Sequence, residues 1–140
     1  MISEKKFDDI FEGDKAQFEI TITGELIDAF VALSGDSNPL HTDEHYATET
    51  PFGGRIAHGM IAGALFSRLV GLYLPGKYSL YLSQTLLFKK PLRIGTNAII
   101  EGIVTQKTDA VRTLTLSTMM HNKTSGEVLV EGEAKVRLLK

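Results

Sequence analysis

Cysteine is absent from this chain of 140 residues, and neither sign of charge dominates it. Without cysteine there is no thiol nucleophile, no thiolate metal site and no disulfide framework, which suits a cytoplasmic protein. Charged residues make up 23% of the chain, and its net charge is −2. This balance lacks the electrostatic footprint of a protein that binds nucleic acid or a membrane surface, so we expect neither partner.

Several motifs of common enzyme classes are also missing. The chain has no G-x-S-x-G elbow, no phosphate-binding loop and no G-x-G-x-x-G after a strand. Serine-hydrolase, nucleotidase and dehydrogenase functions therefore lack support. No apolar run follows the charges of residues 1–6, so we expect no secretory signal. A chain of this length is expected to form a single domain, residues 1–140, with its own hydrophobic core.

A long apolar segment is the most prominent feature that is present. Residues 57–74 are apolar nearly all round, which predicts a helix that is buried on nearly every side. A helix over 60–74 would be about 22 Å long, too short for the roughly 30 Å hydrocarbon core of a membrane. Arg68 also lies within it. We interpret the segment as a core helix, and Gly59 and Gly63 as sites of close backbone packing.

The residues before this segment predict one strand and two shorter helices. Residues 15–20 alternate polar and apolar side chains, as a half-buried strand does. Thr23 is a suitable N-cap for the first helix, and Gly35 is a suitable stop. The second helix is expected to follow Thr42 as its N-cap. The loop 36–41 between the two helices is expected to be non-helical because it contains proline.

The second half of the chain predicts four strands. The last of them alternates apolar and charged residues with a period of two, as a strand with one buried face does. Short turn segments separate neighbouring strands, so we expect antiparallel hairpins. The fold class is α+β, with a five-stranded antiparallel sheet curled around the apolar helix. Because one sheet cannot cover every side of that helix, we also expect a partner subunit. The expected strands are 78–88, 97–107, 111–122 and 127–139.

The strongest candidates for catalytic residues lie between positions 36 and 60. Asp36 and His41 are five residues apart, and Gly59 lies near the expected start of the apolar helix. A carboxylate and an imidazole on a stiff loop can exchange protons with a substrate near neutral pH. A free amide at a helix start can polarise a carbonyl group, and glycine permits close approach. The combination indicates an enzyme that moves protons beside a polarised carbonyl.

Each candidate residue also has a purely structural interpretation. Asp36 can stabilise a turn, and His41 can be an exposed residue ahead of an N-cap. Asn38 fits a loop scaffold, and His58 fits packing or hydrogen bonding within its own loop. Ser67, within an apolar helix, fits a hydrogen bond to a carbonyl one turn earlier. On the residues alone these alternatives stay open.

A second motif overlaps the first. The segment from His41 to His45 matches the H-x-x-E-H pattern of a class of zinc hydrolases. That pattern works when both histidines project from one face of a continuous helix and a further ligand joins them. Because His41 follows Pro39 closely and precedes an expected N-cap, we expect it outside the helix. A match of this length also arises readily by chance, so we expect no metal site.

Two stretches of the chain, Leu33-Ser-Gly-Asp-Ser-Asn-Pro-Leu-His41 and Gly54-Arg-Ile-Ala-His-Gly-Met60, resemble a known family. It is the family of MaoC-like, R-specific enoyl-CoA hydratases (hydratase 2), which have the hot-dog fold. The resemblance covers nearly the whole chain from residue 14 onward. Thioesterases of the same fold lack the Asp-x-Asn-Pro-x-His loop. The resemblance continues through Leu74-Pro-Gly76, Tyr81-Leu-Ser-Gln-Thr85, Phe88-Lys-Lys-Pro91 and Glu131-Gly-Glu-Ala134.

This resemblance implies a hot-dog domain with short overhanging helices. It also implies syn addition of water to a trans-2-enoyl thioester, giving the R-3-hydroxyacyl thioester, and the reverse dehydration. Asp36 and His41 would be the catalytic pair, the Gly59 amide the donor to the thioester carbonyl, and Ser67 a residue near the water. Asn38 and His58 would at most support them. The reaction requires no metal or organic cofactor.

The resemblance further implies a homodimer with a continuous sheet, acting on acyl-CoA or acyl carrier protein (acyl-ACP) thioesters. Two other functions stay open: an acyl-CoA thioesterase of the same fold, and a non-catalytic acyl-thioester-binding or scaffold subunit. Five cationic residues are candidates for contacting a CoA phosphate or an acidic carrier protein, although a solvated surface is the default. They are Arg55, Lys77, Lys89, Lys90 and Arg93.

Overall fold

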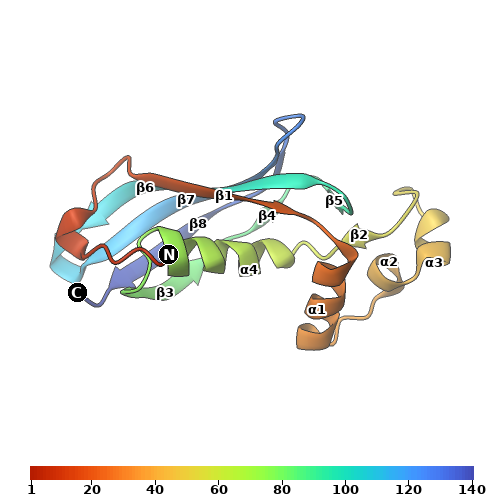
Figure 1. The fold of residues 1–140 in the computed structure, drawn as a ribbon, viewed down its shortest axis with the longest axis horizontal. Coiled ribbons are helices and arrows are strands. Elements are labelled where there is room, and N and C mark those ends of the chain that lie inside the picture. The colour runs from red at the N-terminus through yellow and green to blue at the C-terminus, as the bar shows by residue number, and fades with distance from the viewer.

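The computed structural model describes all 140 residues, and its largest element is a curved antiparallel sheet (Figure 1). The strand order is β1-β6-β7-β8-β3, and β4 also pairs with β8. The strands β6, β7 and β8 follow one another as hairpins, which confirms the prediction from their turn segments. The bounds are β1 Lys15–Thr21, β3 Ser79–Gln84, β4 Leu87–Phe88, β6 Asn97–Thr108, β7 Thr113–Asn122 and β8 Val128–Leu138.

The apolar helix α4 (Ile61–Arg68) runs along one face of this sheet and continues as a π-helical turn, η2 (Leu69–Tyr73) (Figure 1). Its buried side chains include Phe66 and Leu69, which are fully enclosed. This confirms an α+β domain built around a central helix. The sheet leaves one side of α4 uncovered in the single chain, which agrees with the expectation that one sheet cannot cover every side of this helix. One stripe of it, here called the uncovered stripe, is exposed: Met60, Ala64, Ser67 and Arg68.

Two glycines allow close packing near the middle of the sheet. A Cβ atom on Gly102 would lie 2.7 Å from Leu69 Cδ2, and one on Gly132 would lie 1.8 Å from the Thr85 carbonyl oxygen. Thr118 of β7 pairs with Gly102 of β6 on one side and with Gly132 of β8 on the other. Neither neighbour of Thr118 in the sheet therefore carries a side chain. The expected strand 78–88 is interrupted here, because its backbone passes directly over Gly132. It therefore forms two strands, β3 and β4, instead of one.

A chain of hydrogen bonds reaches Thr118, the residue that pairs with these two glycines. The Tyr81 hydroxyl donates to Gln84 Oε1, and Gln84 Nε2 donates to the Thr118 hydroxyl at 2.9 Å. Thr118 is completely buried, so this bond satisfies a polar group that water cannot reach. Burial raises the pKa of the Tyr81 hydroxyl to about 12.

Three short helices overhang one end of the sheet, as the resemblance implied (Figure 1). Helix α1 (Gly24–Ser34) begins and ends where the sequence predicts. The Thr23 hydroxyl accepts a hydrogen bond from the Leu26 N–H at 3.3 Å. Gly35 ends the helix with φ 76°, in the left-handed region that glycine adopts without strain. The chain therefore turns sharply just before Asp36.

The loop after α1 is more helical than predicted. Residues 39–42 form a single helical turn, α2 (Pro39–Thr42), so His41 lies inside a helix. Proline is tolerated at the first position of a helix, because the N–H that it lacks would have no intrahelical partner there. Asn38 Oδ1 caps this turn by accepting the Leu40 N–H at 2.9 Å. The expectation of a non-helical loop was therefore wrong for these residues.

The start of the next helix also differs from the prediction. Helix α3 (Glu44–Thr48) is capped by Asp43, whose Oδ1 accepts the Tyr46 N–H at 3.0 Å. Thr42 is not the N-cap, because its hydroxyl donates back to the Ser37 carbonyl at 3.0 Å and so ties down the preceding turn. The short break between α2 and α3 separates the two halves of the H-x-x-E-H pattern.

A small second sheet was not predicted from the sequence. Strand β2 (Ile56–Ala57) pairs with β5 (Leu92–Arg93) in an antiparallel arrangement. Two-residue strands are too short to show a periodic pattern, so no signal was available. This pair fixes the segment that leads into α4 at the end of the main sheet. None of the helices is long and apolar enough to cross a membrane.

Candidate active site

A cavity of about 520 Å³ opens between the overhanging helices and the beginning of α4. Its size is in the range of small-molecule sites, and its walls combine aromatic side chains with a few polar groups. Four of the sequence-predicted site residues line it together: Asp36, His41, His58 and Gly59. Its remaining walls are Phe30, Ser34, Phe52, Ile56, Ala57, Met60, Phe88, Lys89, Lys90, Pro91, Leu92 and Val130.

Asp36 stands at the turn that Gly35 creates after α1. Its Oδ1 accepts the Asn38 N–H at 3.2 Å, so the side chain stabilises the turn, as the structural interpretation proposed. The same side chain is 51% exposed and lines the cavity. Its carboxylate therefore remains available to a substrate or a water molecule.

His41 is oriented by a backbone carbonyl. Its Nδ1 donates to the Ile56 oxygen at 2.7 Å, and Ile56 belongs to β2. Because a carbonyl oxygen only accepts, Nδ1 must carry the proton in this contact. In the neutral ring, Nε2 is then the atom with the free lone pair. The structure thus selects the tautomer whose Nε2 is able to accept a proton.

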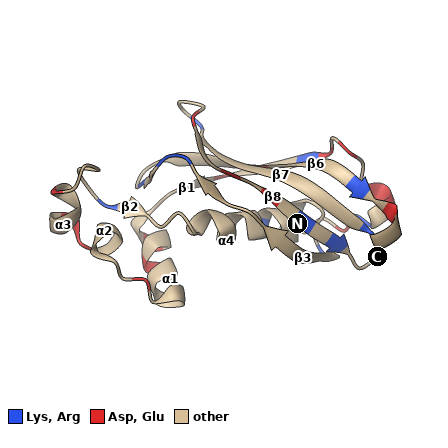
Figure 2. Ribbon diagram, turned by 180° about the vertical axis from the view of Figure 1, so that it is seen from behind, with Lys and Arg blue, Asp and Glu red and all other residues tan.

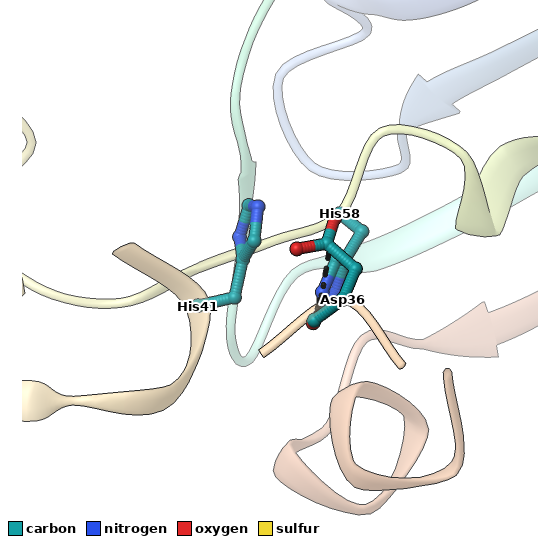
Figure 3. A group of neighbouring side chains, drawn as sticks. All are labelled: Asp36, His41 and His58. Atoms are coloured by element: carbon teal, nitrogen blue, oxygen red, sulfur yellow. Dashed lines mark hydrogen bonds and ion pairs between the residues drawn. The ribbon is translucent and has the colours of Figure 1, made fainter. Parts of the chain in front are cut away.

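His58 approaches the same group from the segment before α4 (Figure 3). It is only 2% exposed, and its Nε2 donates to the backbone carbonyl of Asp36 at 2.9 Å. The same Nε2 lies 3.9 Å from Asp36 Oδ2. Its ring also packs against His41 and Phe30, with ring centroids 3.9 Å and 4.6 Å away. His58 therefore touches both members of the predicted catalytic pair.

Gly59 offers an unused donor. Neither its N–H nor that of Met60 donates a hydrogen bond within the chain, whereas the Ile61 N–H already bonds to the His58 carbonyl at 3.1 Å. Free amides at a helix start attract partial negative charge. Phe88 covers this glycine closely: a Cβ atom on Gly59 would lie 2.8 Å from Phe88 Cδ1. Phe88 was not predicted as a site residue, although it lies in the stretch Phe88-Lys-Lys-Pro91 that carries the family resemblance.

Two of the candidate residues lie outside this group. Asn38 caps α2 and does not line the cavity, which agrees with a scaffold role. Ser67 lies two turns along α4, on the uncovered stripe, and does not line the cavity either. Within a single chain, neither side chain is brought to Asp36 and His41.

The ligand atoms of Asp36, His41 and His58 all lie within 4.8 Å of one another, a spacing that can suit a metal ion. However, His58 Nε2 would have to give up its hydrogen bond to the Asp36 carbonyl in order to coordinate. The H-x-x-E-H residues do not form a site of their own. His45 is exposed on α3, and Glu44 forms an ion pair with Arg55 at 3.5 Å.

Two lysines flank the mouth of the cavity. Lys89 and Lys90 both line it, and each is paired with a glutamate. Lys89 Nζ lies 3.2 Å from Glu131, and Lys90 Nζ lies 3.6 Å from Glu127. All four side chains are substantially exposed, so these pairs contribute little to stability and can rearrange around a ligand.

The other three cationic candidates are engaged elsewhere. Arg55 lies 3.5 Å from Glu44, and Arg93 donates to the Phe52 carbonyl at 2.7 Å. Lys77 forms an ion pair of 2.9 Å with a glutamate near the N-terminus. Cationic segments lie beside β2 in Figure 2, whereas the overhanging helices α1 and α3 carry acidic segments only.

Comparison with known proteins gives a consistent result. A family model described as the MaoC-like domain matches residues 10–125. The chain is 40% identical over 130 residues to the (R)-specific enoyl-CoA hydratase of Rhodospirillum rubrum, covering 93% of this chain and 89% of that protein. It is 41% identical over 126 residues to the (R)-specific enoyl-CoA hydratase of Aeromonas caviae, covering 90% of this chain and 93% of that protein.

A solved structure extends the similarity to the fold. The R-hydratase PhaJ1 of Pseudomonas aeruginosa, in its unliganded form, superposes with a TM-score of 0.90 at 36% identity. The alignment covers 95% of this chain and 84% of that one. The helix-wrapping sheet and its overhanging helices are thus the hot-dog fold that the sequence implied.

Proposed function

The chain belongs to the family of MaoC-like domains, and from this premise we propose how its cavity carries out a hydro-lyase reaction. The reaction is the R-specific hydration of trans-2-enoyl thioesters to R-3-hydroxyacyl thioesters, and the reverse dehydration. We take the whole chain, residues 1–140, as one such domain. The observation that carries the assignment of roles is the bond from His41 Nδ1 to the Ile56 carbonyl. It leaves His41 Nε2 free beside the exposed carboxylate of Asp36.

In this proposal, Asp36 and His41 act on one water molecule. The water oxygen bonds to C3 of the enoyl group, and one of its protons passes to the pair. The pair then returns a proton to C2, so that the elements of water are added across the double bond. Positioned acid–base groups of this kind typically accelerate a reaction by about 10²–10⁴-fold. In the dehydration direction the same groups act in the reverse order.

The Gly59 amide is proposed to receive the thioester oxygen. Attack at C3 moves electron density onto that oxygen, which becomes enolate-like. A fixed amide that no protein group uses can stabilise this charge without rearranging. Phe88 and Phe30 provide the apolar walls that keep bulk water away from the reacting carbons.

We also propose that two chains form a homodimer with a continuous sheet. Strand β3 is the last strand on its side of the sheet, so its outer edge is unpaired, and unpaired edges invite pairing. Large apolar side chains near this edge are about half exposed: Leu80 47%, Leu82 53%, Leu87 56% and Phe88 50%. A second copy placed here would cover them together with the uncovered stripe of α4.

The substrate's carrier is proposed to be CoA or acyl carrier protein. Lys89 and Lys90 at the cavity mouth are the cationic residues best placed to meet its phosphate groups. A cytoplasmic location remains a prediction from the sequence.

Crotonyl-CoA is the substrate that tests the function. The purified protein is expected to remove the absorbance of the conjugated enoyl group without releasing free thiol, and chiral analysis should give the R-3-hydroxy product. Release of thiol would instead identify a thioesterase. No change in either signal would identify a binding or scaffold subunit. The Asp36→Asn variant provides the matched negative control.

A further inference from the structure

The buried imidazole of His58 has no role in the reaction steps described above. It is surrounded by protein, yet it makes its contacts with the residues that carry out the chemistry. We infer that His58 is a positioning residue, which holds Asp36 and His41 in a fixed relation to the Gly59 amide. This inference rests on the proposed function for its kinetic consequences, but its structural part is independent of it.

The first observation concerns the oxygen atom of Asp36 to which His58 donates its hydrogen bond. Its Nε2 donates at 2.9 Å to the backbone carbonyl of Asp36, while Oδ2 of the carboxylate is 3.9 Å away. The bond therefore fixes the chain at Asp36 without occupying the carboxylate. A direct bond to the carboxylate would compete with water or substrate for the same lone pairs. The geometry holds the residue and leaves its reactive group free.

The second observation is the contact with His41. The His58 ring packs against the ring of His41 at a centroid distance of 3.9 Å and against that of Phe30 at 4.6 Å. His41 is fixed at its other side by Nδ1, which bonds to the carbonyl of Ile56. One hydrogen bond leaves a ring free to tilt about the bond, whereas a flat neighbour against its face restricts that tilt. Together the two contacts define the direction of His41 Nε2.

The third observation is the continuity of the chain. Ile56, His58 and Gly59 lie within four consecutive residues, 56–59. This segment orients His41 through a carbonyl, holds Asp36 through a ring and presents the proposed donor amide. Its place is fixed by the pairing of β2 with β5. A single segment of the chain thus fixes the positions of Asp36, His41 and the Gly59 amide relative to one another. A reaction that is sensitive to small displacements of these groups needs such an arrangement.

The fourth observation separates this role from ordinary packing. His58 Nδ1 is buried and meets no hydrogen-bonding group of the protein. A buried polar atom without a partner is unfavourable for folding, so the imidazole has a cost at Nδ1 that an apolar ring of similar size would not have. Stability alone therefore does not explain an imidazole at this position. Its Nε2 donor, which phenylalanine or leucine lacks, provides the explanation.

Two substitutions separate the two contacts of His58. His58→Phe keeps a flat ring against His41 and loses the donor to the Asp36 carbonyl. His58→Gln loses the ring and keeps an amide nitrogen at the position of Nε2. We expect His58→Phe to lower kcat with crotonyl-CoA by about 10²-fold, the effect of misplacing reacting groups by roughly 1 Å. KM should change little, and the variant should remain fully folded, because phenylalanine keeps a ring in the same buried position.

His58→Gln should recover at least a tenth of the wild-type kcat, because the donor is restored. His45→Gln, at an exposed histidine of α3, is the matched control and should leave kcat unchanged. The inference is overturned if His58→Phe keeps wild-type kcat, or if His58→Gln is no better than His58→Phe. It is also overturned if kcat falls only in proportion to a loss of folded protein, with a clearly lower Tm.

A measurement without substrate keeps this inference separate from the proposed function. Amide hydrogen exchange of residues 36–41 should be faster in His58→Phe and close to wild type in His58→Gln, because the donor holds that turn. If wild-type protein proved inactive with crotonyl-CoA while this exchange pattern appeared, the proposed function would fail and the positioning role would stand. Unchanged exchange in His58→Phe would remove the positioning role whatever the activity.

Discussion

At the scale of single residues, the site depends on which atom of each side chain is already engaged. His41 is held through Nδ1, and Asp36 is held through its backbone carbonyl and Oδ1. The atoms that remain free are His41 Nε2 and Asp36 Oδ2. The Gly59 amide is likewise free of any partner within the chain. The groups that stabilise the local structure are thus different from the groups that are proposed to react.

The closeness of Phe88 to Gly59 leads to the first prediction. Gly59→Ala is expected to lower kcat with crotonyl-CoA by about 10²–10³-fold, the usual effect of losing one donor to a developing oxyanion. The added Cβ would lie 2.8 Å from Phe88 Cδ1, so the ring or the amide must shift. Steady-state kinetics measures the effect.

The double variant Gly59→Ala, Phe88→Ala provides the control. Alanine removes all three ring atoms nearest to the added methyl group, so part of the lost activity should return relative to Phe88→Ala alone. Unchanged kcat in the single Gly59→Ala variant would contradict the prediction that the added methyl group displaces the amide from the thioester oxygen.

The sequence predicted part of this site. Asp36, His41 and Gly59 were identified from residue type and from the family resemblance, since their motif is local. The contacts of His58 were not predictable, because they join residues 22 positions apart through a ring nitrogen and a backbone carbonyl. No motif records a bond of that kind. Ser67 shows the opposite case: the resemblance placed it near the water, but a single chain leaves it on the uncovered stripe.

At the scale of helices and strands, Gly132 decides how β3 and β4 lie on β8. A Cβ atom here would lie 1.8 Å from the Thr85 carbonyl oxygen, so Gly132→Ala must push the two strands apart. We expect a loss of about 1–3 kcal/mol or more in the free energy of unfolding, as for overpacked cores. Urea unfolding at one fixed protein concentration measures it.

Gly24→Ala is the matched control for this change. The nearest atom to its added Cβ is Arg55 Nη2 at 3.6 Å, an ordinary contact, and Gly24 is the first residue of α1. Alanine favours helix over glycine, so this variant should be neutral or more stable by up to about 1 kcal/mol. Equal stability of the two variants would show that the contact at Gly132 is relieved without strain.

The partly buried hydroxyl of Tyr81 makes the stability of the protein depend on pH in the alkaline range. Because its pKa is raised to about 12 from the usual 10, the folded chain keeps a proton that the unfolded chain has lost. The contribution of Tyr81 to stability is therefore complete below about pH 10 and declines as the pH rises toward 12.

We accordingly expect Tyr81→Phe to show a shallower loss of unfolding free energy across this range. The corresponding substitution at Tyr46, which is exposed on α3, should leave the slope as in wild type. Parallel slopes for wild type and Tyr81→Phe would contradict the assignment.

The elements themselves were largely predictable, and the exceptions have physical causes. The capped helix α1 and the long strands of the second half follow from patterns within each segment. The break between β3 and β4 depends on a glycine in another strand, Gly132, which the local alternation of residues 78–88 does not contain. Asp43, and not Thr42, is the N-cap of α3, because the Thr42 hydroxyl already donates a hydrogen bond to the Ser37 carbonyl. Such competition for one hydrogen bond is visible only in three dimensions.

At the scale of the whole molecule, the uncovered stripe and the free edge of β3 predict a dimer. Light scattering during chromatography is expected to give twice the chain mass of 15.4 kDa. Ala64→Glu, in the middle of the uncovered stripe, should dissociate the dimer and lower activity, since a buried unpaired charge is unfavourable. Ala29→Glu, at an exposed position of α1, should change neither. A stable, fully active wild-type monomer of 15.4 kDa would refute the shared interface.

The central claim is that Asp36 and His41 act together on one water molecule, and turnover of crotonyl-CoA by three variants tests it most directly. Asp36→Asn and His41→Gln are each expected to lower kcat by about 10²–10⁴-fold while the fold and the assembly persist. The double variant should be far less impaired than the product of the two single effects, because both residues serve one step. Near-wild-type turnover in either single variant would contradict the claim, and so would a fully multiplicative loss in the double variant.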